Sequence, residues 1–150
     1  MAHTFTCLQY HLVFSTKERK RFLSPDCIGR IHGYMGGIIR NVGGEPICVG
    51  GTDDHVHILC SLRANLCVAE ATGKIKANAS KWIHETMPSM ADFAWQEGYG
   101  AFTVSRLNMN AVAKYIQNQA SHHKETTFQE EFIRMLKRHG IAFDERYLWN

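Results

Sequence analysis

Hydrophobic and polar residues follow two different periods along this chain, and the two periods predict its elements. Alternation with a period of two is typical of a strand, whereas apolar residues three and four positions apart are typical of an amphipathic helix. On this basis we predict strands at about residues 4–15, 46–49, 55–62 and 99–105. We predict helices at about residues 25–41, 66–85, 110–123 and 127–139.

The order of these elements, β-α-β-β-α-β with further helices at the end, is typical of the split βαβ or ferredoxin-like fold. The sequence therefore predicts an α+β, RRM-like sandwich, with an antiparallel sheet, helices on one face and additional C-terminal helices. A chain of 150 residues, 45% of them hydrophobic, is long enough for one filled core and too short for two ordinary domains. We expect residues 1–150 to form a single domain.

Capping and turn residues mark the ends of the predicted helices. Ser24 followed by Pro25 predicts one helix start, and Asn65 predicts a second. The capping-box sequence Thr127-Phe128-Gln129-Glu130 predicts a third start. Gly140 predicts the end of the last helix, because glycine readily adopts the left-handed conformation that follows a helix.

Composition and charge narrow the class of protein. The net charge of +3 is mildly basic and compatible with an anionic partner, without identifying one. The five cysteines form no C-x-x-C pair, which argues against a disulfide scaffold or a cysteine zinc site and for a reducing compartment. No apolar run approaches the length of a membrane-spanning helix, and the start of the chain has no signal-peptide pattern. We expect a soluble, cytoplasmic protein with no membrane partner.

Two histidines stand in the third predicted strand, within the segment Thr52–Leu59. Residues two apart on a strand point to the same face, so His55 and His57 should project from one side while Val56 and Ile58 enter the other. Imidazole is a common ligand of transition metals, and two on one rigid strand form half of a metal site. Solvent-facing strand histidines are the ordinary alternative for so short a pattern.

A tyrosine and a glutamine share one face of the predicted helix at residues 110–123. Tyr115 and Gln119 are four residues apart, on a face more polar than the one formed by Val112, Ile116 and Ala120. With two histidines, a tyrosine and a neutral oxygen ligand form a plausible site for cleaving phosphodiesters. Taken alone, Tyr115 is more often a half-buried helix aromatic.

Further motifs run from one end of the chain to the other. They are Tyr10-His11-Leu12-Val13-Phe14-Ser15-Thr16-Lys17, His55-Val56-His57-Ile58-Leu59, Ser80-Lys81-Trp82-Ile83, the segment Trp95–Ser105, Tyr115-Ile116-Gln117-Asn118-Gln119 with His122-His123, and Tyr147-Leu148-Trp149-Asn150. In order and number these motifs resemble the single-tyrosine HUH transposases of the insertion-sequence 200/605 family. That family includes relatives associated with repetitive extragenic palindromes.

The resemblance implies a metal-dependent transposase that cleaves and rejoins single-stranded DNA with hairpin ends. Tyr115 would be the nucleophile that forms a covalent 5′-phosphotyrosine link and leaves a free 3′-OH. His55, His57 and Gln119 would hold a divalent metal ion, Mg²⁺ or Mn²⁺. These ligands are neutral, so the ion would keep its full charge for polarising the scissile phosphate. The resemblance also implies a homodimer, in which the tyrosine helix of one subunit meets the histidine pair of the other.

Basic and aromatic side chains offer candidate contacts to DNA. The predicted loop after the first strand carries Lys17, Arg19, Lys20 and Arg21, which could bind phosphates or simply form a solvated loop. Lys74 and Lys81 are seven apart on the second predicted helix and share a face, as a DNA backbone track or as an ordinary charged surface. The aromatic residues Trp95, Tyr99 and Phe102 could stack on unpaired bases, although core packing is favoured for at least two of them.

Other residues near the motifs have two interpretations each. Asp53 and Asp54 could supplement the metal or orient a histidine ring, with a turn role favoured. His123 is one helical turn from Gln119 and could bind phosphate, with a surface position as the default for it and for His122.

The sequence gives less support to two other classes of protein. A zinc nucleobase deaminase needs H-x-E followed by P-C-x-x-C, and neither occurs. The main alternative is a catalytically silent or domesticated single-stranded nucleic-acid-binding module on the same fold. The presence of His55, His57, Tyr115 and Gln119 together disfavours it.

Overall fold

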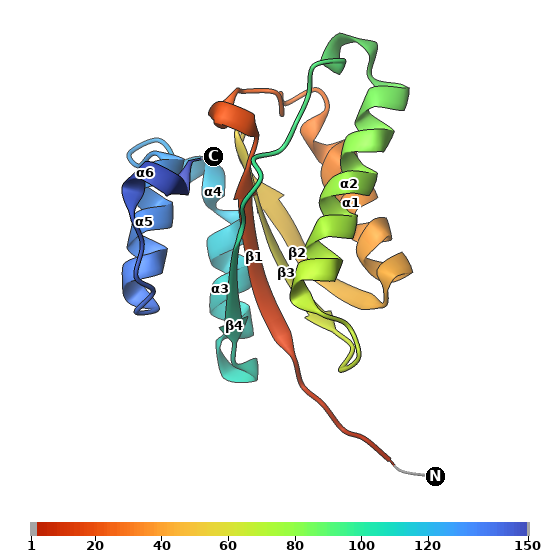
Figure 1. Ribbon diagram of the computed structural model, residues 1–150, viewed down its shortest axis with the longest axis vertical. Coiled ribbons are helices and arrows are strands. Elements are labelled where there is room, and N and C mark those ends of the chain that lie inside the picture. The colour runs from red at the N-terminus through yellow and green to blue at the C-terminus, as the bar shows by residue number, and fades with distance from the viewer. Residues whose placement is uncertain (1–2, 150) are drawn as a thin grey trace.

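A four-stranded antiparallel sheet forms the centre of the computed structural model, which describes residues 3–149 (Figure 1). The strands are β1 (Gln9–Ser15), β2 (Gly44–Gly51), β3 (His55–Leu62) and β4 (Gly100–Val104). They lie in the order β2-β3-β1-β4, so that β1 and β3 are the two central strands. With helices after β1 and β3, this is the predicted ferredoxin-like arrangement, and the fold prediction is confirmed.

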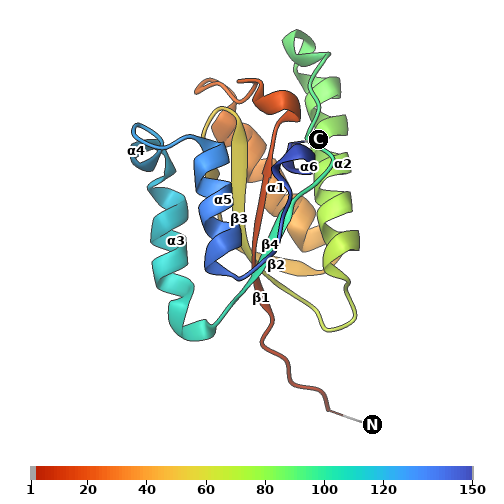
Figure 2. The ribbon, with the colours of Figure 1, turned by 60° about the vertical axis from the view of Figure 1, so that its left-hand side comes forward.

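Two long helices cover one face of the sheet, α1 (Ile28–Val42) and α2 (Val68–Thr86) (Figures 1 and 2). Between them and the sheet lies the larger hydrophobic core, to which Leu12, Phe14, Ile58, Met35 and Ile75 contribute fully buried side chains. Burial of one such side chain contributes roughly 1.5–3 kcal/mol. This face therefore supplies most of the apolar burial that holds the sheet and the helices together.

The opposite face of the sheet is covered by the helices that follow β4 (Figures 1 and 2). These are α3 (Met109–Gln117), α4 (Gln119–His122), α5 (Phe128–Arg138) and the short α6 (Glu145–Leu148). A smaller hydrophobic cluster joins α5 to this face and consists of Val13, Phe102, Phe128, Phe132 and Leu136. Three short 3-10 turns complete the structure: η1 (Lys17–Arg19), η2 (Pro88–Met90) and η3 (Arg106–Asn108). Among the described residues, no helix combines the length and the apolar character needed to cross a membrane.

Helix α3 packs directly against β2 because the strand has a glycine at the point of contact. A Cβ atom at Gly50 would lie 2.7 Å from the side chain and the carbonyl oxygen of Ile116, which is closer than such atoms can pack. Ile116 is 1% exposed, so this contact is part of the interior. Because Ile116 is held against β2, the neighbouring Tyr115 on α3 is also held over the sheet.

Two helix starts differ from the prediction. Helix α1 begins at Ile28 and not directly after Ser24, because the Ser24 carbonyl accepts hydrogen bonds from the amides of Cys27 and Ile28 and so forms a separate turn. Helix α2 begins at Val68, because the Leu66 amide bonds to the Arg63 carbonyl and places the predicted cap in a turn. Strand β1 also begins later than predicted, at Gln9.

The predicted caps at the C-terminal end are confirmed. Thr127 Oγ1 accepts a hydrogen bond from the Glu130 amide at 3.2 Å, which is the N-cap half of a capping box, and the Glu130 carboxylate accepts a bond from the Thr127 hydroxyl at 3.1 Å. Gly140 follows α5 with a φ of 68°, as expected for a glycine after a helix. The predicted helix at residues 110–123 is instead divided into α3 and α4 at Asn118.

Candidate functional site

Strand β3 presents its two histidines to the face that α3, α4 and α5 cover. His55 and His57 are both fully buried, while Val56 and Ile58 enter the core beneath α1 and α2. The prediction that the two imidazoles share one face is therefore confirmed. The alternative of solvent-facing strand histidines is wrong, because the C-terminal helices cover this face.

Helices α3 and α4 bring Tyr115 and Gln119 to the same place. Gln119 Oε1 lies 2.8 Å from His55 Nε2, and the Tyr115 ring centroid lies 5.7 Å from that of His57. The helix break at Asn118 does not separate the two residues, since the Asn118 amide still bonds to the Lys114 carbonyl. All four residues of the predicted site thus meet within one chain.

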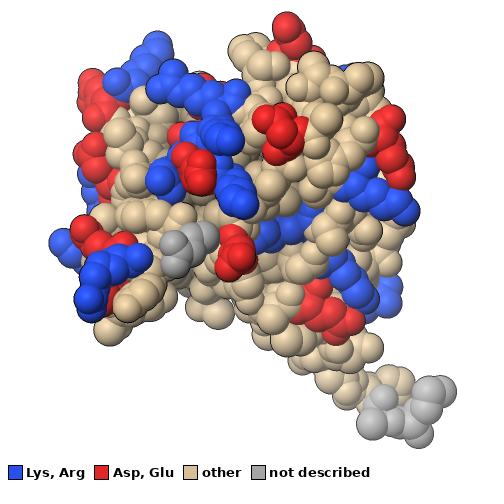
Figure 3. Space-filling view, turned by 45° about the horizontal axis from the view of Figure 1, so that its top comes forward, with Lys and Arg blue, Asp and Glu red and all other residues tan. Residues whose placement is uncertain are grey.

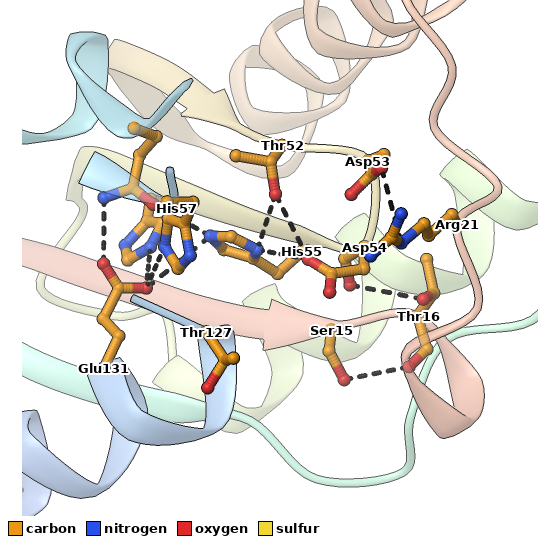
Figure 4. A network of polar contacts seen from close by, with 12 residues as sticks. Ser15, Thr16, Arg21, Thr52, Asp53, Asp54, His55, His57, Thr127 and Glu131 are labelled. Carbon is orange, nitrogen blue, oxygen red and sulfur yellow. Dashed lines mark hydrogen bonds and ion pairs between the residues drawn. The ribbon is translucent and has the colours of Figure 1, made fainter. Parts of the chain in front are cut away.

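A carboxylate that sequence reasoning missed, Glu131 on α5, lies at the centre of this cluster (Figure 4). Its Oε1 atom is 3.0 Å from His57 Nε2 and 3.1 Å from His123 Nε2. Its Oε2 atom accepts a hydrogen bond from Gln119 Nε2 at 3.0 Å and another from the Tyr115 hydroxyl. Glu131 is 1% exposed, so it is a buried charge held by four neighbours.

One sequence signal could have pointed to Glu131. Phe128, Phe132 and Leu136 form the apolar stripe of α5, and Glu131 lies on that same buried stripe. A charged residue at a core position is rare unless it is paired or binds a metal. The partner could not have been named, however, because His57 and Glu131 are 74 positions apart.

Two further histidines join the cluster from the end of α4. His123 stacks against His55 with ring centroids 4.4 Å apart, and His122 Nε2 lies 3.4 Å from Glu131 Oε2. The Nε2 atoms of both residues are buried without a properly oriented hydrogen-bond partner among the described residues. The default surface position is therefore wrong for His123. Together with His55, His57 and Glu131, it places ligand atoms within 4.8 Å of one another.

Each strand histidine has a separate partner behind it. His55 Nδ1 lies 2.7 Å from Asp54 Oδ1 and 3.1 Å from Thr52 Oγ1, so the aspartate orients the ring (Figure 4). This is the role that the sequence favoured less for Asp54. On the other side of the His57 ring, Nδ1 lies 2.7 Å from His11 Nε2. Burial, and to a lesser extent the neighbouring His57, lowers the pKa of His11 to about 3.

Burial and hydrogen bonding set the charges in the cluster. Burial alone would raise the pKa of the Glu131 carboxyl, but the close contacts with His123, His57 and the Tyr115 hydroxyl lower it well below its ordinary value. Burial lowers the pKa of His57, with Glu131 opposing the change. Burial, together with the adjacent negative charge, raises the pKa of the Tyr115 phenol. The cluster therefore holds an ionised carboxylate, a neutral His57 and a protonated tyrosine.

The donor set around His55 fits a bound cation. His55 Nδ1 faces the oxygen of Asp54, and its Nε2 atom faces the oxygen of Gln119, whose amide nitrogen is already used toward Glu131. A neutral imidazole has only one N–H, so it cannot satisfy both oxygens. A cation held by His55, Gln119 and Glu131 would remove this conflict, because Nε2 would then offer its lone pair. Imidazole, amide and carboxylate groups are suitable ligands for several divalent ions.

Two cavities flank the cluster. A cavity of about 440 Å³ lies beside the tyrosine and is lined by His11, Phe102, Asn108, Tyr115 and Arg138, among others. A second, of about 580 Å³, lies on the other side and is lined by Arg21, Asp54, His123 and Lys124, among others. Both are in the size range of ligand sites. The first cavity therefore reaches Tyr115, and the second reaches His123.

The predicted DNA-binding residues lie in two places. Arg21 lines the second cavity and lies 3.8 Å from Asp53, while Arg19 stacks over Trp149. Lys17 and Lys20 are exposed on the same loop as these two arginines. Lys74 and Lys81 are exposed on α2, across the sheet from the cluster, and pair with acidic residues one turn away. Their contact with DNA stays a prediction.

The surface does not carry one uninterrupted basic track on the face shown in Figure 3. Lys and Arg side chains gather there in several groups, with Asp and Glu side chains between them. Of the three aromatic candidates, Trp95 and Phe102 are buried and Tyr99 is 37% exposed. Core packing for two of the three is therefore confirmed.

Comparison with known proteins agrees with this geometry. A search of curated proteins gives no match. Among solved structures, a candidate transposase from Deinococcus radiodurans R1 is 20% identical, with a TM-score of 0.65 over 79% of this chain and 96% of that one. A REP-associated tyrosine transposase, solved bound to a REP hairpin, is 12% identical, with a TM-score of 0.60 over 82% of this chain and 74% of that one. Identities this low show a shared fold.

The family itself is shown by the sequence. Residues 4–119, which include the histidine pair, Tyr115 and Gln119, match the family model described as "Transposase IS200 like". This range covers every strand of the sheet and the tyrosine helix. The chain therefore belongs to the IS200-like transposase family.

Proposed function

We propose that this protein is a single-tyrosine HUH transposase that cleaves and rejoins single-stranded DNA through a covalent 5′-phosphotyrosine intermediate. The observation that carries the proposal is the meeting of Tyr115 with His55, His57 and Gln119 around one buried carboxylate. A binding module has no need for a half-buried tyrosine hydroxyl among candidate metal ligands. The proposal refines the transposase role that family membership gives.

His55, His57, Gln119 and Glu131 would hold the divalent ion, Mg²⁺ or Mn²⁺, with His123 as a further donor within reach. When bound, such an ion polarises a phosphate and stabilises the charge that develops on its oxygens. Glu131 extends the ligand set predicted from sequence by one anionic group. Asp54 keeps the His55 ring turned so that Nε2 faces the cluster.

Tyr115 would attack the scissile phosphorus. Its Oη atom forms the new bond to phosphorus, and the bond between phosphorus and the 3′-oxygen breaks, which leaves a 5′-phosphotyrosine and a 3′-OH. Glu131 Oε2 already accepts the hydrogen bond of the phenol and so orients the hydroxyl. The phenol proton passes to water as the new bond forms. The 3′-oxygen takes up a proton from water as it leaves.

The proposed substrate is DNA with an unpaired segment next to a hairpin. A regular duplex keeps its backbone stacked and paired, whereas His55, His57, Gln119 and Glu131 are at most 1% exposed and Tyr115 and His123 line cavities beside them. A flexible single strand fits such an approach. The structural neighbour solved with a REP hairpin supports a hairpin as the partner. The five free cysteines agree with action in the reducing cytoplasm.

A homodimer with exchanged tyrosine helices is the proposed assembly. The family resemblance supports it, and η3, between β4 and α3, is the segment that could redirect the helix. In the single chain, Tyr115 lies against the histidines of its own β3. The cis and trans arrangements predict different results when two inactive variants are mixed, as described in the Discussion.

A covalent-adduct assay tests the function. Labelled single-stranded oligonucleotides with a hairpin are incubated with the protein and Mn²⁺, then analysed after denaturation. We expect a protein–DNA band that disappears with excess chelator and that is much weaker with blunt duplex of the same sequence at matched salt. Binding without any adduct, under all metals tried, would favour the catalytically silent binding module.

A further inference from the structure

The partner of His57 is a second histidine from the neighbouring strand. His11 lies on β1, two positions before Val13, which is the cross-strand partner of His57. The two rings have centroids 5.0 Å apart, and His11 Nε2 is 2.7 Å from His57 Nδ1. His11 is 6% exposed, so this hydrogen bond is shielded from water.

Hydrogen counting on this pair limits what His57 can do. The Nε2 atom of His57 faces the cluster, and it can bind a cation only through its lone pair. The hydrogen of a neutral His57 must then lie on Nδ1, which requires an acceptor at that position. The nearest atom is His11 Nε2, and it accepts only when the hydrogen of His11 is on its own Nδ1.

We propose that His11 is a positioning residue, which accepts a hydrogen bond from His57 Nδ1 and so makes His57 present its Nε2 lone pair to the divalent ion. The inference rests on the metal site of the proposed function. His11 itself touches neither the ion nor the DNA phosphate in this role. It acts through the tautomer and orientation of the His57 ring.

Packing alone does not account for a histidine at this position. The neighbours of His11 on the same face of the sheet include Val13, Leu59 and Phe102, which are buried and apolar. An aliphatic side chain would fill such a place without the cost of burying a polar ring. Asp54 provides an independent parallel, because it holds the other ligand, His55, by the same ring atom. Each strand histidine thus has an acceptor at Nδ1.

The test compares two substitutions of His11 in the whole chain. His11→Leu fills the space without an acceptor, whereas His11→Gln places an amide oxygen close to the original Nε2 position. Mn²⁺ binding is measured by titration calorimetry without DNA. We expect His11→Leu to bind Mn²⁺ about 10–100-fold more weakly and His11→Gln to recover most of the affinity, as for other residues behind metal-bound histidines.

Two controls separate this inference from the metal site itself. Phe102→Leu changes a neighbour of His11 that forms no hydrogen bond to His57, and it should bind Mn²⁺ like the unmodified protein. His57→Ala should lose Mn²⁺ binding, because it removes a proposed metal ligand. If His57→Ala binds Mn²⁺ unchanged, the proposed metal site is wrong. If His57→Ala loses binding and His11→Leu keeps it, only the role of His11 is overturned.

A second measurement on the unmodified protein covers the case in which His11→Leu fails to fold. Nitrogen-15 NMR of the histidine rings reports which nitrogen carries the hydrogen, here with diamagnetic Mg²⁺ at saturation. We expect the His57 hydrogen on Nδ1 and the His11 hydrogen on Nδ1. A hydrogen on Nε2 of either ring in the Mg²⁺-bound protein contradicts the proposal.

Discussion

The two faces of the sheet bury the same two strands to a similar degree, yet they bury different kinds of side chain. Toward α1 and α2, strands β1 and β3 direct the fully buried Leu12, Phe14, Val56 and Ile58. Toward α3, α4 and α5, the same strands direct Gln9, His11, His55 and His57, each at most 8% exposed. Burying polar groups costs free energy unless they are paired. The first face therefore contributes most of the apolar burial, whereas the second combines a smaller apolar cluster with a polar network that this burial helps to maintain.

This division predicts that substitutions on the two faces separate activity from stability. On the site face, conservative changes should stop chemistry with little effect on unfolding. On the helix face, conservative changes should lower stability and leave the site of each folded molecule intact. The predictions below test this separation, beginning with the largest effect.

Tyr115→Phe should have the largest effect. The change removes only the hydroxyl that contacts Glu131, so we expect covalent DNA attachment to fall at least about 10³-fold, as for loss of a nucleophile. DNA binding and the free energy of unfolding should change little. Denaturing gels with labelled oligonucleotide measure the adduct. Tyr147→Phe is the matched control, because Tyr147 is 69% exposed and should retain full attachment. An adduct that persists without the Tyr115 hydroxyl means that another residue is the nucleophile.

Mixing two inactive proteins tests where the site face is completed. Tyr115→Phe and His57→Ala are combined under conditions that allow subunits to exchange. If the tyrosine helix crosses to a partner, heterodimers regain one complete site and cleavage recovers to at most about half of the unmodified level. If Tyr115 acts on its own chain, as the contacts within the single chain have it, the mixture stays inactive.

Gln119 sharpens the same experiment. It lies on α4, directly after the tyrosine helix, and contacts His55. If both helices cross together, Gln119→Ala should complement His57→Ala as well as Tyr115→Phe does. Recovery with the tyrosine variant alone would show that Gln119 stays with the histidines of its own chain.

Ile75→Ala tests the helix face. Ile75 on α2 is fully buried in the larger core, so we expect the free energy of unfolding to fall by about 2–5 kcal/mol. Urea unfolding measures this change, and Mn²⁺ affinity in native buffer should remain that of the unmodified protein. Leu107→Ala removes a side chain that is 95% exposed and should leave stability unchanged. A loss of metal affinity in Ile75→Ala at a temperature where it is folded would contradict the separation of the two faces.

How much could be predicted from sequence depended on how local each feature is. The alternation that places His55 and His57 on one face, and the four-residue step between Tyr115 and Gln119, are properties of single elements, and both held. The helix starts near Ser24 and Asn65 were wrong, because a turn that also uses a capping residue precedes each helix.

The remaining site residues could not be predicted because they act across the fold. Glu131 is 74 positions from His57 in the sequence and His11 is 46 positions from His57, and no local period connects such partners. His123 could be placed one turn from Gln119, but its burial depends on how α5 packs over the sheet. For these residues the sequence supplies the chemical group, and the tertiary structure supplies its partner.

The smallest predicted effect is a pH dependence of stability, to which His11 on the site face and His32 on α1 both contribute. The pKa of His11 is lowered to about 3 in the folded protein, and burial lowers that of His32, on α1, to about 4. In the unfolded chain both return to about 6.5, so between these values the unfolded state binds protons that the folded state does not. Stability is therefore full above pH 6.5 and falls as the pH is lowered, by up to about 1.4 kcal/mol per pH unit for each histidine.

Urea unfolding of the unmodified protein and of two variants between pH 7 and pH 5 measures this dependence. His11→Gln should remove one histidine's share of the slope, and His32→Gln should remove the other. The raised pKa of His123 acts in the opposite direction, because its bond to Glu131 stabilises the protonated form and is lost as the pH rises. The lowered pKa of His57 acts in the same direction as those of His11 and His32. An equal slope in His11→Gln and the unmodified protein would mean that His11 takes up a proton in the folded state as readily as in the unfolded chain.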